Sequence, residues 1–132
     1  MATKIQKFDL EKLSKQLKKA WSPINVGTVD GFVVRMAKFR GRYHWHRHEG
    51  DELFIVFKGK IKIQTKVGDI EITQGEGVKI PKSVEHCPIA ILPSVVLMFE
   101  NKIISQTKKP KSMFGKFRDL PSFEREEIDR FS

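Results

Sequence analysis

The pattern of hydrophobic and polar residues divides the chain into a β-rich middle and two different ends. Between residues 24 and 101, short runs rich in Val, Ile and Phe alternate with turn residues, and residues 60–64 place Ile at every second position. A period of two is typical of strands with one buried face. Short strands at this spacing predict an all-β sandwich or barrel. The residues expected in its interior are Phe54, Val56, Ile61, Ile63 and Ile72.

The two ends of the chain follow other patterns. Leu10, Leu13 and Leu17 recur at spacings of three and four, which predicts an amphipathic helix over residues 9–20 with Asp9 as its N-cap. After residue 104 the chain is basic and shows little periodicity before a weak apolar stripe near its end. We therefore expect three parts: an N-terminal helical segment over 1–23, a β-barrel over 24–104, and a basic loop with a short C-terminal helix over 105–132.

The composition limits the classes of protein that the chain can be. A chain of 132 residues suits one domain, and the single cysteine, Cys87, cannot form an internal disulfide. The formal charge of +9 lies mainly in the ends, since residues 21–101 contain eleven basic and nine acidic residues. We therefore expect no nucleic-acid partner, although residues 102–118 contain six basic residues and no acidic one. Without a long apolar run or an apolar leader, we also expect no membrane span and a cytoplasmic location.

Histidines supply the candidate chemistry. Three of the four histidines, His44, His46 and His48, lie within five residues, and Glu52 follows after a Glu-Gly-Asp turn. In an extended strand, His46 and His48 would point to the same face, so both can bind one metal ion. His86 lies in a β-rich segment far along the chain, where the fold can bring it to the same place.

Two motifs built on these residues resemble those of the cupin superfamily. The first motif of that family runs Gly, His-x-His, Glu and Gly, and residues 41–59 resemble it, with four residues instead of five between Gly41 and His46. The second motif contains Gly, Pro, Gly, His and Asn. Residues 75–90 resemble it, with Ser83 in place of the second glycine and Ala90 in place of the asparagine.

This resemblance implies a double-stranded β-helix, or jelly-roll barrel, with short flanking helices around it. It also implies that one divalent transition metal ion (Fe, Mn, Ni, Cu or Zn) is held near the mouth of the barrel. The ligands carried over from the family are His46, His48, Glu52 and His86.

Several neighbouring residues are candidates for the lining of the site. His44 has the same parity as the two histidines that follow it, so it is either a substrate-contacting or supporting group or a surface or strand-edge histidine. Phe54 lies two residues after Glu52, so in a strand it faces the same side and should line the interior. Arg42 and Arg35 can bind a substrate carboxylate through two hydrogen bonds, or they can be solvated surface residues.

The family resemblance leaves the activity open. The chain is either a small metal-dependent enzyme of the dioxygenase, isomerase or epimerase, or decarboxylase type, or a non-enzymatic cupin that binds or senses a small ligand. We further expect a homodimer. The outer face of the strand that begins at Glu52 carries Leu53, Ile55 and Phe57, which is too apolar for a solvated face.

Overall fold

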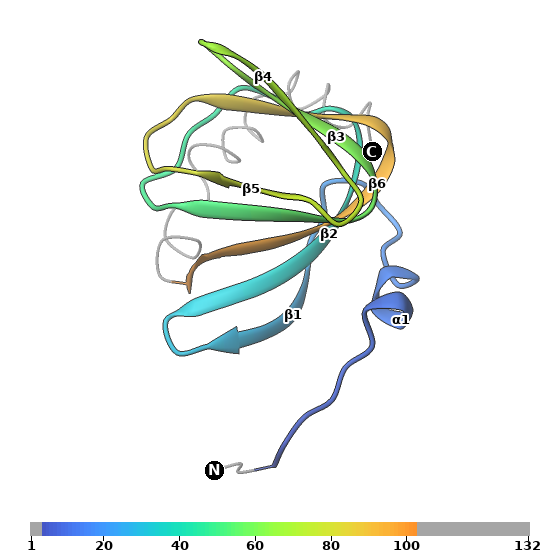
Figure 1. Cartoon of the computed structure of the whole chain (residues 1–132). Coiled ribbons are helices and arrows are strands. Elements are labelled where there is room, and N and C mark those ends of the chain that lie inside the picture. Colours follow the sequence, from blue (N-terminus) through green and yellow to red (C-terminus); the bar gives the residue numbers. More distant parts are fainter. Residues whose placement is uncertain (1–3, 103–132) are drawn as a thin grey trace.

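Six antiparallel strands form one curved sheet, which folds over on itself as a barrel in this computed structural model (Figure 1). The structure describes residues 4–102. Neighbouring strands follow the order β1-β2-β6-β3-β4, and β5 pairs with β3. The all-β barrel predicted from the sequence is confirmed. Its strands are β1 (Ile24–Val29), β2 (Phe32–Arg42), β3 (Glu52–Thr65), β4 (Gly68–Thr73), β5 (Gly77–Ile80) and β6 (His86–Asn101).

The two longest strands, β3 and β6, run side by side through both halves of the barrel. Their register shifts around Lys58 and Lys60, where the intervening Gly59 has a φ of 100°. Ser94 of β6 lies at this point, and its Oγ accepts a hydrogen bond of 2.9 Å from the Lys60 N–H. This bend lets one half of β3 pair with β5 and the other half with β4. Glu52, the first residue of β3, therefore lies at one end of the barrel.

Alternate residues of the strands fill the interior. Phe54 lies opposite Met98 and Val56 opposite Val96, and all four belong to one buried cluster. The cluster is built from alternating positions because directly paired residues of antiparallel strands share a face. Every residue predicted for the interior is at most 2% exposed: Phe54, Val56, Ile61, Ile63 and Ile72.

The N-terminal helix is shorter than the predicted span over residues 9–20. Helix α1 covers only Leu10–Ser14, and the Asp9 side chain accepts a hydrogen bond from the Lys12 N–H at 3.0 Å, which confirms the predicted N-cap. Beyond Ser14 the chain continues in a tighter turn, with the Leu17 N–H donating to the Ser14 carbonyl. Leu17 and Ala20 become buried there, so packing overrides the helical periodicity.

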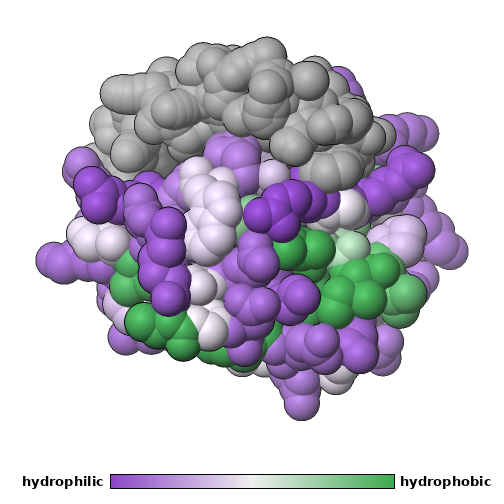
Figure 2. All heavy atoms as spheres, turned by 90° about the horizontal axis from the view of Figure 1, so that it is seen from above, coloured by the Kyte–Doolittle hydropathy of each residue, from purple (hydrophilic) through white to green (hydrophobic). Residues whose placement is uncertain are grey.

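One face of the described part of the molecule carries mostly polar side chains. Figure 2 shows hydrophilic side chains over much of the face that it presents, with small hydrophobic groups between them. The described helix is too short to cross a membrane. The C-terminal loop and helix predicted for residues 105–132 lie outside the described residues, so that part of the predicted organisation stays a prediction.

Candidate metal centre

His46 and His48 lie in the connection between β2 and β3. The expectation that they share an extended strand is wrong, because β2 ends at Arg42 and β3 begins at Glu52. Within this connection only His46 makes a ladder contact, an isolated bridge to His86 in which each backbone N–H donates to the other carbonyl at 2.9–3.0 Å. The bridge fixes the His46 backbone to the start of β6, so two histidines far apart in the sequence become neighbours.

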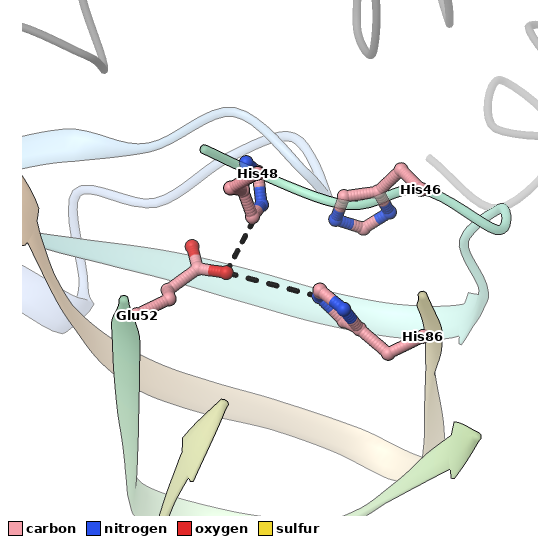
Figure 3. A group of neighbouring side chains, drawn as sticks. All are labelled: His46, His48, Glu52 and His86. Carbon is pink, nitrogen blue, oxygen red and sulfur yellow. Dashed lines mark ion pairs between the residues drawn. The ribbon is translucent and has the colours of Figure 1, made fainter. Parts of the chain in front are cut away.

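Four side chains converge at this end of the barrel (Figure 3). One ligand atom from each of His46, His48, Glu52 and His86 lies within 4.8 Å of the ligand atoms of the others. Glu52 Oε1 is 3.0 Å from His48 Nε2 and 3.8 Å from His86 Nε2. The structure therefore brings together the four residues that the two motifs singled out, and a group of this kind can hold a metal ion.

Backbone carbonyls fix the tautomer of two of the imidazoles. His46 Nδ1 lies 2.9 Å from the His44 carbonyl oxygen, and His86 Nδ1 lies 2.9 Å from the Val84 carbonyl oxygen. A carbonyl can only accept a hydrogen bond, so Nδ1 carries the proton in each ring. In the neutral ring the lone pair is then on Nε2. Such outer hydrogen bonds typically orient the histidine ligands of metal ions.

The electrostatics keep these groups in the forms that bind a cation. Burial, followed by the neighbouring His86, His48 and His44, holds the pKa of His46 well below its usual range. Burial also lowers the pKa of His86. For Glu52, burial alone would raise the pKa, but the interactions with His48, His86 and Arg35 outweigh it and the pKa is lowered. Near neutral pH, Glu52 is therefore a carboxylate, and the lowered pKa values of His46 and His86 favour their unprotonated imidazoles.

Two buried polar atoms of the site have no hydrogen-bond partner among residues 4–102. They are His86 Nε2 and Glu52 Oε1, whose 3.0 Å approach to His48 Nε2 is an ion pair without the geometry of a hydrogen bond; both residues are less than 10% exposed. Unsatisfied buried polar atoms are rare in proteins and costly, so each calls for an explanation. A divalent first-row transition ion fits here, because imidazole nitrogens and a carboxylate are ligands that such ions accept.

Glu100 is a second carboxyl at the site that the sequence analysis did not single out. It lies directly opposite Glu52 in the β3–β6 ladder and therefore faces the same side. Its Oε2 lies 3.6 Å from Arg35 Nη1. Burial and the nearby Glu52 charge raise the pKa of Glu100 to about 7. Glu100 lies at the same alternating positions of the strand as Val96 and Met98, and this spacing could have predicted from the sequence that it faces the interior.

The other residues predicted near the site take different places. The His44 ring lies 4.0 Å from that of Tyr43, and the His44 carbonyl orients His46. Phe54 belongs to the buried core and touches Phe39 edge-on. The structure does not bring Arg42 into the group of four, since its guanidinium donates to Gln64 Oε1 at 3.0 Å.

Comparison with known proteins agrees with this geometry. The family described as cupin domain matches residues 32–99, which enclose all four clustered residues. The chain belongs to the cupin family. The Bacillus subtilis (strain 168) protein YdbB is 30% identical over 92 residues, which cover 68% of this chain and 81% of YdbB.

Solved structures are similar as well. A cupin-2 domain protein from Shewanella frigidimarina is 28% identical, with a TM-score of 0.70, and the match covers 71% of this chain and 93% of that one. Protein NMB1881 from Neisseria meningitidis is 26% identical, with a TM-score of 0.67 and coverages of 73% and 99%.

The second motif of this cupin departs from the family at a turn beside the site. Ser83 stands where the family motif has glycine, and its φ is 69°, in the left-handed region that glycine adopts most readily. The Ser83 N–H donates to the His48 carbonyl at 2.8 Å. The turn therefore keeps the backbone shape of the motif, at a conformational cost, and holds the connection that carries His48.

Proposed function

We propose that the chain is a metal-dependent cupin enzyme in which His46, His48, Glu52 and His86 hold one divalent transition metal ion. The observation that supports this best is the convergence of four ligand atoms within 4.8 Å, two of them buried without a hydrogen-bond partner. The ion is Fe, Mn, Ni, Cu or Zn, since this set of three imidazoles and one carboxylate suits each of them.

The histidine ligands would present an unprotonated ring nitrogen to the ion, because the proton of the ring is held on the other nitrogen. The carbonyls of His44 and Val84 hold the Nδ1 protons of the two imidazoles that they contact, which leaves each Nε2 as the donor atom. When bound, the ion would act as a Lewis acid on an oxygen of the substrate or of water. Four protein ligands leave one or two positions of a five- or six-coordinate ion for that oxygen.

Glu100 favours an enzyme over a protein that only binds a ligand. It supplies a carboxyl that faces the same side as Glu52 but lies outside the group of four. A positioned carboxyl near a reacting centre is the kind of group that general acid–base catalysis uses. We therefore propose a small organic molecule as substrate and a dioxygenase, isomerase or epimerase, or decarboxylase reaction.

A panel of small substrates, tested with each metal, examines this proposal. The reloaded protein is incubated with candidate diols, thiols, sugars and organic acids, while an oxygen electrode records uptake and NMR records isomers and decarboxylated products. We expect turnover of at least one class with the unmodified chain and its loss in the Glu100→Gln variant with metal still bound. A loaded protein that binds a compound without converting any would favour the ligand-binding cupin instead.

We also propose that the chain forms a homodimer through the outer face of β3. Leu53, Ile55 and Phe57 are only partly buried in the single chain. Their outward row continues on β6, where Phe99 lies opposite Leu53 and Leu97 opposite Ile55. A continuous apolar row of this kind supports an interface between two copies.

A further inference from the structure

Trp21 is held against β2 in an unusual backbone conformation. Its φ is 62°, in the left-handed region that a bulky residue rarely adopts. The Trp21 N–H donates to the Lys38 carbonyl at 2.8 Å, and the indole Nε1 donates to the Arg40 carbonyl at 3.1 Å. Such a conformation persists where the surroundings determine it strongly, and it is often found near functional sites.

The indole of Trp21 begins a series of ring contacts that ends at His46. Its ring is stacked on Tyr43, with centroids 4.6 Å apart and an interplanar angle of 26°. The Tyr43 ring, in turn, meets the His46 ring edge-on, at 5.3 Å and 89°. Trp21 also packs against Phe39 of the core, with ring centroids 4.5 Å apart. The segment before β1 therefore supports one wall of the metal centre.

From these contacts we infer that Trp21 is a positioning residue for His46 and acts through the ring of Tyr43. The inference rests on the proposed metal site. Trp21 lies outside residues 32–99, the part of the chain that matches the family, so this support belongs to the N-terminal segment of this protein.

The physical reason lies in the rotation of the His46 ring. The His44 carbonyl fixes which nitrogen carries the proton, and the bridge to His86 fixes the backbone. The plane of the ring is set by its packed neighbours, which are the rings of His86, His48 and His44 and, edge-on, the ring of Tyr43. Tyr43 is itself only 7% exposed, its N–H donates to the Pro88 carbonyl, and its ring also contacts that of His44 at 4.0 Å. Stacking on a planar indole limits the tilt of the Tyr43 ring.

A purely structural role for Trp21 predicts a different result from a positioning role. If Trp21 only fills space, side chains of similar bulk should replace it equally well once their effect on stability is known. If the stacked ring orients Tyr43 and His46, a planar ring should preserve metal affinity and a flexible chain should not. Phe and Met provide this comparison, because both lack the indole N–H and both are large and apolar.

The test measures Co²⁺ affinity by competition with a chromophoric chelator for the variants Trp21→Phe and Trp21→Met. Trp45→Phe is the matched control, because Trp45 precedes His46 directly, is 39% exposed and has its ring beneath Lys66 Nζ. We expect Trp21→Met to bind Co²⁺ about 10- to 100-fold more weakly, the usual effect of losing an outer support. Trp21→Phe and Trp45→Phe should stay close to the unmodified protein. Circular dichroism and thermal unfolding without metal check the fold of each variant.

A second readout needs no metal. Long-range ¹H–¹⁵N NMR of the imidazoles should show the Nδ1-protonated form of His46 in the unmodified protein and a mixture in Trp21→Met. Equal Co²⁺ affinity of folded Phe and Met variants would overturn the inference. If the unmodified protein binds neither Co²⁺ nor any of Fe²⁺, Mn²⁺, Ni²⁺, Cu²⁺ and Zn²⁺, the proposed metal function is wrong. An unchanged His46 spectrum in Trp21→Met would then overturn the positioning role separately. If Trp21→Met does not fold, Trp21→Leu takes its place in the same comparison with Trp21→Phe.

Discussion

Replacing Gly59 by alanine should destabilise the barrel strongly, because the bend of β3 leaves no room for a side chain. Gly59 has a φ of 100°, and a Cβ placed there would lie 2.7 Å from the Cβ and 2.8 Å from the Cα of Ser94. The second of these is a backbone atom of the neighbouring strand, so relief requires β3 and β6 to move apart. The same bend carries the chain from the half of β3 that begins at Glu52 to the half that pairs with β4.

Two separate costs add up at this position. A residue other than glycine in such a conformation costs about 1–3 kcal/mol, and forcing extra atoms into a packed region costs about 1–3 kcal/mol more. Gly75 isolates the first cost, because its φ is 87° and no atom lies within 4 Å of a Cβ there. Gly31 has neither a positive φ nor an atom within 4 Å of a Cβ, so Gly31→Ala should be neutral or should stabilise the protein by up to about 1 kcal/mol.

Urea unfolding of the three alanine variants measures these costs directly. We expect the free energy of unfolding to fall in the order Gly31→Ala, Gly75→Ala, Gly59→Ala, with Gly59→Ala about 2–6 kcal/mol below the unmodified protein. If Gly59→Ala and Gly75→Ala lose the same amount, the close approach of Ser94 contributes nothing and the reasoning about this bend is refuted.

Three further outcomes follow from the structure. The pKa of Glu100 rises from 4.5 to about 7 on folding. Its charged form therefore lowers the free energy of unfolding above pH 7, and this loss of stability disappears as the pH falls to 4.5. Glu100→Gln should therefore stabilise the metal-free protein by roughly 3 kcal/mol at pH 8 and by little at pH 4.5 in urea unfolding; a gain that does not depend on pH would contradict this. Sedimentation equilibrium should give twice the chain mass of 15.3 kDa, and a clean value of 15.3 kDa would exclude the dimer. Asp9→Ala removes the N-cap of α1 and should lower the free energy of unfolding by about 1 kcal/mol. The Co²⁺ affinity should stay unchanged, and weaker Co²⁺ binding would mean that α1 supports the metal centre.

The parts of the structure that repeat locally could be predicted from the sequence. Alternation predicted the interior residues of β3, because a strand with one buried face must place apolar groups at every second position. The resemblance of residues 41–59 and 75–90 to the two cupin motifs singled out the group of four, since the spacing of His46, His48 and Glu52 indicated one site and the second motif added the distant His86. The N-cap at Asp9 was likewise readable from its residue type.

Features that depend on tertiary packing could not be predicted in the same way. The helix after Asp9 stops at Ser14 because burial of Leu17 outweighs the leucine spacing, and periodicity alone gives no sign of this. The connection that carries His46 is held by the bridge to His86 and by the Ser83 N–H that donates to the His48 carbonyl, contacts that appear only when the barrel closes. Trp21 becomes a neighbour of Tyr43 through the hydrogen bonds that its backbone N–H and its indole N–H donate to β2, a contact that has no local signature in the sequence.

The stoichiometry of bound metal tests the central claim most directly. The protein is stripped, reloaded in turn with Fe²⁺, Mn²⁺, Ni²⁺, Cu²⁺ and Zn²⁺, desalted and analysed by mass spectrometry, together with His46→Ala, His86→Ala and the control His44→Ala. The account predicts close to one ion per chain for at least one metal, near zero in the first two variants and nearly full binding in the control. Absence of stoichiometric binding, or equal loss in all three variants, would contradict the assignment of His46, His48, Glu52 and His86 as the ligands.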